Sequence, residues 1–179
     1  MNTLLCFGLG YSARLVAERL ASEGWQIIGT STTQAGARAI SQAGYKGLHF
    51  DGTAPSDEVS AALNEATHIL LSIPPAVAGD PAFVHYGSAI AASANVRWIG
   101  YFSTVGVYGD KAGGWVDEDT PATPGSERGQ RRLAAESAWR ELGRATGKCL
   151  NVFRLPGIYG PGRSAIEDVM AGTARSIIK

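Results

Sequence analysis

The chain has 179 residues, of which 45% are hydrophobic and 18% charged, with 16 Lys and Arg against 16 Asp and Glu. That length suits one domain with its own core, and the balanced charge speaks against nucleic acid or a membrane surface as a partner. The longest apolar run, ILLSIPPAVAG, is too short for a membrane span, and the N-terminal MNTLLCFGLG lacks the basic region of a signal peptide. We therefore expect a single cytoplasmic domain over residues 1–179.

Apolar runs predict six strands, at residues 3–8, 25–30, 47–50, 68–73, 96–103 and 149–155. Helical patterns lie between and after them, at residues 12–24, 35–44, 56–66, 81–94, 129–147 and 165–174. Gly24 is expected to end the first helix and Ser56 to cap the third. Strands that are apolar throughout and alternate with helices predict an α/β Rossmann fold, a doubly wound parallel sheet. Ligands of such sheets bind beyond the carboxyl ends of the strands.

The cysteines and histidines carry little functional signal. Cys6 and Cys149 lie in apolar, strand-like segments, which predicts buried free thiols in a reducing compartment. His49, His68 and His85 show no metal-ligand spacing, so no metal site is expected.

A glycine motif follows the first predicted strand. In FGLGYSA, Gly8, Gly10 and Ala13 fit the pattern G-x-G-x-x-[G/A], with Tyr11 and Ser12 opening the helix. Gly8 would allow the tight turn, Gly10 would let the backbone approach a pyrophosphate, and Ala13 would allow close packing of the helix. A plain glycine-rich turn is the alternative, but the strand–loop–helix context favours a dinucleotide site.

The end of the second strand bears on the choice of cofactor. An acidic residue normally stands there when NAD is bound, but this strand ends in Thr30, Ser31 and Thr32. These hydroxyls do not repel a 2′-phosphate, which favours NADP over NAD, although no arginine stands nearer than Arg38. Asp51, which closes the third strand, could meet the adenine end, and a turn-forming Asp is the alternative.

Later motifs resemble the extended short-chain dehydrogenase/reductases, the NAD(P)-dependent epimerase/dehydratase family. The fifth strand runs into YFSTVGVYGD and the sixth into RLPGIYGPGR, with an acidic, proline-bearing loop (VDEDTPATP) and LAAES between them. The resemblance covers essentially the whole chain. It implies a C-terminal substrate lobe, and most of that lobe is expected to be absent from this chain.

The resemblance also implies roles for particular residues. Thr104 matches the family's Ser/Thr that bonds the substrate oxygen, and a strand-end cap is the alternative for its hydroxyl. The remaining matches are the stretch beside the cofactor ribose and the wall around the nicotinamide, which comprise Ser72, Ile73, Pro74, Pro156 and Gly157.

The chain departs from the family where the catalytic motif Y-x-x-x-K should open the long helix. The tyrosine falls on Arg128 and the lysine on Arg132. Arg132 could keep the ribose contacts, whereas Arg128 cannot relay a proton and would instead bind an anion. Tyr108 is the nearest alternative phenol, and we expect packing before catalysis there. Arg131 is interpreted as a helix-face charge that can pair with Glu127 or Glu136 through solvent.

The resulting hypothesis is an NAD(P)-binding domain of an oxidoreductase that transfers hydride to or from a small polar, sugar-type substrate. Thr104, Arg128, Arg132 and Tyr108 are its candidate catalytic residues. The alternative is a non-catalytic NAD(P)-binding sensor or scaffold. We expect a small-molecule partner and no nucleic acid or membrane partner, and a homodimer is a further hypothesis.

Overall fold

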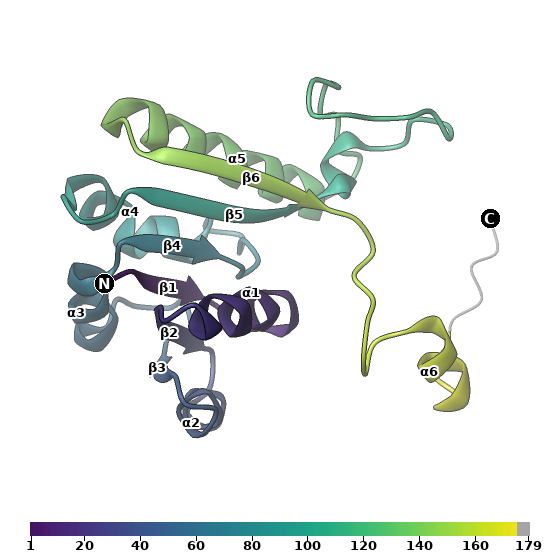
Figure 1. The fold of residues 1–179 in the computed structure, drawn as a ribbon. Coiled ribbons are helices and arrows are strands. Elements are labelled where there is room, and N and C mark those ends of the chain that lie inside the picture. The colour runs from purple at the N-terminus through teal and green to yellow at the C-terminus, as the bar shows by residue number, and fades with distance from the viewer. Residues whose placement is uncertain (175–179) are drawn as a thin grey trace.

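The computed structural model describes residues 1–174 and contains one six-stranded parallel sheet with helices on both faces (Figure 1). Its strands are β1 (Thr3–Phe7), β2 (Gln26–Ser31), β3 (Lys46–His49), β4 (His68–Leu71), β5 (Trp98–Thr104) and β6 (Cys149–Leu155). The order across the sheet is β3-β2-β1-β4-β5-β6. The predicted doubly wound Rossmann fold is therefore confirmed. Each predicted strand overlaps an observed strand, and their ends differ by a few residues at most.

The helices also lie where the sequence predicts them, with ends that shift by a few residues. They are α1 (Tyr11–Ser22), α2 (Gln34–Gln42), α3 (Asp57–Glu65), α4 (Pro81–Ala92), α5 (Glu127–Thr146) and α6 (Ala165–Met170), with a short 3-10 helix η1 (Val105–Tyr108) after β5. Ser56 caps α3 by accepting a hydrogen bond from the Val59 N–H, as expected. Gly24 adopts a φ of +82° just after α1, which suits a helix stop.

Two apolar clusters lie on opposite faces of the sheet, because successive strand residues point in opposite directions. On one face, Leu5 and Phe7 of β1 pack with α3, α4 and α5, around the fully buried Trp139. On the other, Leu4 and Cys6 pack with α1 and α2. Packing on both faces fixes the register of the strands. Because all of the strands are parallel, the residues that follow them lie along one edge of the sheet.

The environment of Cys149 differs from the prediction. Cys6 is a buried free thiol as expected, but Cys149 is exposed. The sequence suggested a buried strand here, whereas β6 is last in the strand order and none of its residues is fully buried. Cys149 also begins the strand, and an edge position leaves it open to solvent.

Within residues 1–174, no helix has the length and apolar character needed to cross a membrane. The same residues contain no group of three or more His, Cys, Asp or Glu side chains that could hold a metal ion.

The helix α6 is shorter than the predicted 165–174, and all of its residues are exposed.

Candidate functional site

The candidate site lies where the strand order reverses. From β1 the chain builds outward through β2 and β3 and then returns to place β4 on the other side of β1. Ligands of open α/β sheets bind in the crevice at such a point, outside the carboxyl ends of the strands. All strand pairs are parallel, so the predicted segments gather at this one edge; they are residues 8–13, 30–32, 72–74, 104 and 156–157.

The glycine loop is pressed against the end of β4. Gly8 has a φ of +84°, and a Cβ there would stand 2.7 Å from Cγ2 of Ile73. Ser72 continues the pairing, since its N–H donates to the carbonyl of Phe7 at 2.9 Å. Gly8 therefore needs to be glycine for both its backbone angle and its contact with Ile73.

Gly10 stands in a different environment. It is the N-cap of α1, and apart from the adjoining backbone no atom of the described residues lies within 4 Å of the position that a Cβ would take. The space in front of this residue is open, as the approach of a ligand to the backbone requires. Ala13, one turn into the helix, is fully buried and lets α1 pack closely on the sheet.

The first turn of α1 has free hydrogen-bond donors. Within the described residues 1–174, no side chain caps this helix, whereas a Ser, Thr or Asp side chain caps each of α2 to α6. The first helical bond runs from the Arg14 N–H to the Gly10 carbonyl, so the N–H groups of Tyr11, Ser12 and Ala13 precede the i to i−4 ladder. Together with the helix dipole they form an arrangement suited to an anion.

The hydroxyls at the end of β2 divide into two kinds. Thr30 is buried, and its hydroxyl accepts a hydrogen bond of 2.8 Å from the Gly8 N–H. Ser31 accepts a longer bond, of 3.4 Å, from the Thr33 N–H. Thr32 is exposed. Thr30 thus supports the glycine loop, and Ser31 and Thr32 are the hydroxyls left near the surface.

Asp51 forms a local turn. Its carboxylate accepts hydrogen bonds from both the N–H and the hydroxyl of Thr53, at 2.9 and 2.7 Å. These hydrogen bonds lower the pKa of Asp51. The turn-forming role left open by the sequence is present, and the exposed carboxylate lies at the end of the crevice near β3.

Thr104 ends β5 and caps the 3-10 helix η1. Its hydroxyl accepts a hydrogen bond of 3.1 Å from the Gly106 N–H. A hydroxyl that accepts one bond still has its own proton to donate. The capping role and the donation of a hydrogen bond to a ligand are therefore compatible.

Arg132 reaches inward from α5 to the ends of two strands. One guanidinium nitrogen, Nη1, donates to the carbonyl oxygens of Ile73 and Phe102, at 3.4 and 3.0 Å, and to the hydroxyl of Tyr101 at 3.2 Å. Burial raises the pKa of Tyr101 to about 12, against the opposing effect of Arg132. Tyr101 is therefore neutral, and the Arg132 guanidinium is fixed between the ends of β4 and β5.

Arg128 and Arg131 are not held in this way. Arg128 is exposed, and within residues 1–174 its side chain has neither a hydrogen bond nor an ion pair. The pairing of Arg131 with Glu136 through solvent is wrong, because Glu136 is fully buried and is bound to Arg140 and Arg154. Arg128 and Arg132 start from one helix face, but only Arg132 turns to the sheet.

Tyr108 lies in a packed environment. Its side chain is 5% exposed, and the Arg154 guanidinium lies 4.6 Å from the centre of its ring. Such a cation–π contact anchors the ring in place. The surroundings are those expected for a packing residue.

The loop after β6 crosses toward α1. Pro156 and Gly157 are exposed just beyond the strand. Farther along, the Pro161 carbonyl accepts a hydrogen bond of 3.2 Å from the Tyr11 hydroxyl. The segment from β6 thus passes the carboxyl edge of the sheet and touches the helix that carries the glycine loop.

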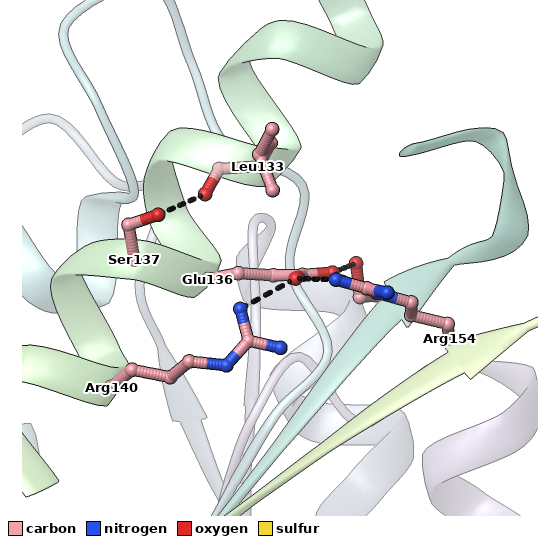
Figure 2. Close-up of polar contacts among 6 residues, drawn as sticks. Leu133, Glu136, Ser137, Arg140 and Arg154 are labelled. Carbon is pink, nitrogen blue, oxygen red and sulfur yellow. Dashed lines mark hydrogen bonds and ion pairs between the residues drawn. The ribbon is translucent and has the colours of Figure 1, made fainter. Parts of the chain in front are cut away.

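Sequence reasoning missed the buried ion cluster around Glu136. The carboxylate binds Arg154 and Arg140, as Figure 2 shows. It also accepts a hydrogen bond from the hydroxyl of Ser103. Arg140 lies four residues after Glu136, a spacing at which helix side chains meet, so one pair could have been read from the sequence. The contacts with β5 and β6 depend on tertiary packing.

Comparisons with known proteins find relatives both in sequence and in structure. YeeZ from Escherichia coli K12 is 31% identical over 173 residues, which are 91% of this chain and 61% of YeeZ. A functionally unknown conserved protein from Silicibacter pomeroyi DSS superposes with a TM-score of 0.80 at 45% identity, over 92% of this chain and 57% of that one. The chain therefore spans about three fifths of the length of these relatives. No protein-family model matches it.

Two further structural neighbours have a function stated for them. A protein from Methylobacillus flagellatus assigned to the NAD-dependent epimerase/dehydratases has a TM-score of 0.69 at 25% identity, over 90% of this chain and 56% of that one. A UDP-glucuronic acid 4-epimerase from Bacillus cereus, solved with NAD, has a TM-score of 0.70 at 18% identity, over 96% and 64%, which shows the shared fold alone.

Proposed function

We propose that this chain, which has the fold of the NAD-dependent epimerase/dehydratases and other short-chain dehydrogenase/reductases, is the NAD(P)-binding domain of an oxidoreductase. The observation that carries the proposal is the uncapped N-terminus of α1 beside the open space at Gly10. It lies at the reversal of strand order, where a dinucleotide pyrophosphate would be held by backbone N–H groups.

The other residues would bind along the crevice. Ser31 and Thr32 would meet the adenosine ribose, where hydroxyls in place of a carboxylate favour NADP over NAD. Asp51 would lie toward the adenine. Beyond the pyrophosphate, the ribose and nicotinamide would meet the end of β4, Arg132 and the loop after β6, contributed by Ser72, Ile73, Pro74, Pro156 and Gly157.

The reaction proposed is oxidation or reduction of a small polar substrate of the sugar type. A bound nicotinamide dinucleotide would supply the hydride chemistry. Thr104 would donate a hydrogen bond to the substrate oxygen, and the exposed Arg128 would bind an anionic group of the substrate. Tyr108 is buried under Arg154, so we assign proton exchange to water rather than to this phenol. A homodimer and a cytoplasmic location stay predictions.

Cofactor binding is tested by titrating NADPH and NADH into the protein and following the fluorescence of the reduced nicotinamide. We expect saturable binding, tighter for NADPH. A Gly10→Ala variant should lose about tenfold or more in affinity, because the new methyl group fills the approach to the backbone. Its unfolding free energy should fall by no more than about 2 kcal/mol, since Ala is less favourable than Gly at an N-cap but leaves the rest of the helix intact.

The matched control is Gly125→Ala, in the loop that precedes α5, which also adds a methyl group where no described atom lies within 4 Å. It should bind NADPH as the wild type does. Failure of both nucleotides to bind at millimolar concentration would contradict the proposal.

Catalysis is tested separately, with a panel of carbonyl and sugar substrates and a protein that carries the substrate lobe as well as this domain. We expect turnover that falls in Arg128→Ala by roughly tenfold or more, the loss of one charge-assisted contact. A protein that binds NADPH, turns over nothing and gains activity with Arg128→Tyr would instead be the non-catalytic relative.

A further inference from the structure

Glu136 is a fully buried carboxylate that no step proposed above uses. Its relative exposure is 0%, and it lies on the face of α5 that meets the sheet. Oε2 accepts hydrogen bonds from Nη1 of Arg140 at 2.9 Å and from Nη2 of Arg154 at 3.0 Å (Figure 2). Oε1 accepts from Nε of Arg154 at 3.2 Å and from the hydroxyl of Ser103. The carboxylate is thus bound from three elements at once.

The charge on Glu136 is maintained by these partners. Burial alone raises the pKa of the carboxyl, but the hydrogen bonds from Arg154 and Ser103 outweigh it and leave the pKa below its usual range. Burying a charged group has a large solvation cost, and well-packed apolar residues often serve stability equally well. Stability alone does not account for a buried charge at this place. The position of the cluster, at the ends of β5 and β6, points to a further role.

The cluster holds the ends of β5 and β6. Ser103 directly precedes Thr104, and successive strand residues point to opposite faces, so fixing Ser103 toward α5 directs Thr104 away from it. On β6, Arg154 is followed by Leu155, which pairs in register with Thr104. Pro156 and Gly157 come next. The Glu136 carboxylate thus fixes Ser103, which directly precedes Thr104, and Arg154, which lies two residues before Pro156 and its loop.

A third connection runs from Arg154 to η1. Its guanidinium binds Glu136 with two nitrogens and lies over the ring of Tyr108. A forked guanidinium bound through two parallel hydrogen bonds has a fixed plane. The orientation of Arg154, set by Glu136, therefore also sets the position of Tyr108 and of the short helix that Thr104 caps.

We propose that Glu136 is a positioning residue for the nicotinamide half of the site, acting through Ser103 and Arg154 on Thr104 and on the Pro156–Gly157 loop. The inference rests on the proposed function, because it assumes that this half of the crevice takes the nicotinamide. Within residues 1–174, none of the hydrogen bonds or ion pairs of Glu136, Arg140 and Arg154 reaches β1 or β2, where the adenosine half lies. Loss of Glu136 should consequently affect one half of the cofactor and not the other.

The experiment compares two ligands in the full chain. NADPH spans both halves of the crevice, whereas adenosine 2′,5′-bisphosphate lacks the nicotinamide and its ribose. We expect Glu136→Gln to weaken NADPH binding by roughly tenfold, because small misplacements at such sites are costly, and to leave the affinity for adenosine 2′,5′-bisphosphate within about twofold. Glu136→Asp, which keeps the charge, should recover part of the NADPH affinity.

The matched control is Glu141→Gln on the exposed side of the same helix, which should bind both ligands as the wild type does. Equal weakening of both ligands in Glu136→Gln would show a general structural role and overturn the inference, as would no change in either. If Glu136→Gln fails to fold, Ser103→Ala and Arg154→Lys test the same selective loss.

The outcome for the wild type separates the two proposals. A wild-type protein that binds neither ligand removes the proposed function itself. A wild-type protein that binds both, with a variant that binds both equally well, removes only the role of Glu136.

Discussion

The hydroxyl of Thr30 accepts a hydrogen bond of 2.8 Å from the backbone N–H of Gly8. The neighbouring Leu9 N–H donates to the Thr30 carbonyl at 2.9 Å, so β2 holds the glycine loop through two consecutive bonds. Thr30 is 1% exposed, which makes it part of the support of the loop. The interpretation of the β2 hydroxyls as a 2′-phosphate site therefore rests on Ser31 and Thr32.

Thr30→Val should destabilise the protein. The substitution keeps the shape of the side chain but leaves the part-buried Gly8 N–H without its acceptor. A fully buried unpaired donor costs about 1–3 kcal/mol, and we expect a loss near the lower end of that range. Urea denaturation should show this loss, whereas Thr30→Ser should retain most of the stability. Equal stability of the Val variant and the wild type would contradict the assignment of the hydroxyl to the loop.

Thr32→Asp should change the preference between cofactors. A carboxylate at the end of β2 repels a 2′-phosphate and can bond a free ribose hydroxyl. We expect the ratio of NADPH to NADH affinity to fall by about tenfold, and Thr32→Asn, of nearly the same size, to change it little. Parallel titrations of both nucleotides measure the ratio, and an unchanged ratio in the Asp variant would place the 2′-position elsewhere.

The two thiols should differ in reactivity. Burial raises the pKa of Cys6 to about 12, and only the thiolate reacts. Cys149 is exposed at the start of β6. Treatment of the folded protein with iodoacetamide should add one label, detected by mass spectrometry and lost in Cys149→Ser. Labelling of Cys6 at a comparable rate under native conditions would contradict the packing of β1.

Stability at acidic pH should report the ion cluster. The pKa of Glu136 is lowered in the folded protein, so the unfolded chain binds more protons as the pH falls and the stabilisation from the carboxylate is lost. The contribution is present above the ordinary carboxyl pKa. We expect wild type to exceed Glu136→Gln by about 3 kcal/mol near pH 7.

That difference should shrink as the pH falls below about 4, because a protonated Glu136 resembles Gln. Urea denaturation at several pH values measures it, and Glu141→Gln serves as the control without a buried charge. A difference that stays constant down to pH ~3 would show that the charge of Glu136 does not contribute.

The order of strands and helices could be predicted from the sequence because local patterns encode it. Apolar runs interrupted by Gly, Pro and capping residues such as Ser56 mark each element without reference to the rest of the fold. Errors arose where the environment depends on neighbours. Cys149 lies in an apolar segment but at the edge of the sheet, and Glu136 reads as a surface charge although α5 carries it into the interior.

The sequence by itself determined the alternation of strands and helices, the glycine loop at the end of β1 and the replacement of the expected Tyr and Lys by Arg128 and Arg132. These are properties of short segments and of their order. Tertiary structure alone decided that Thr30 supports the loop, that Arg132 is fixed between β4 and β5, and that Glu136 joins β5, β6 and α5. The physical reason is that hydrogen-bond partners and burial arise from residues far apart in the chain, which only the packed sheet brings together.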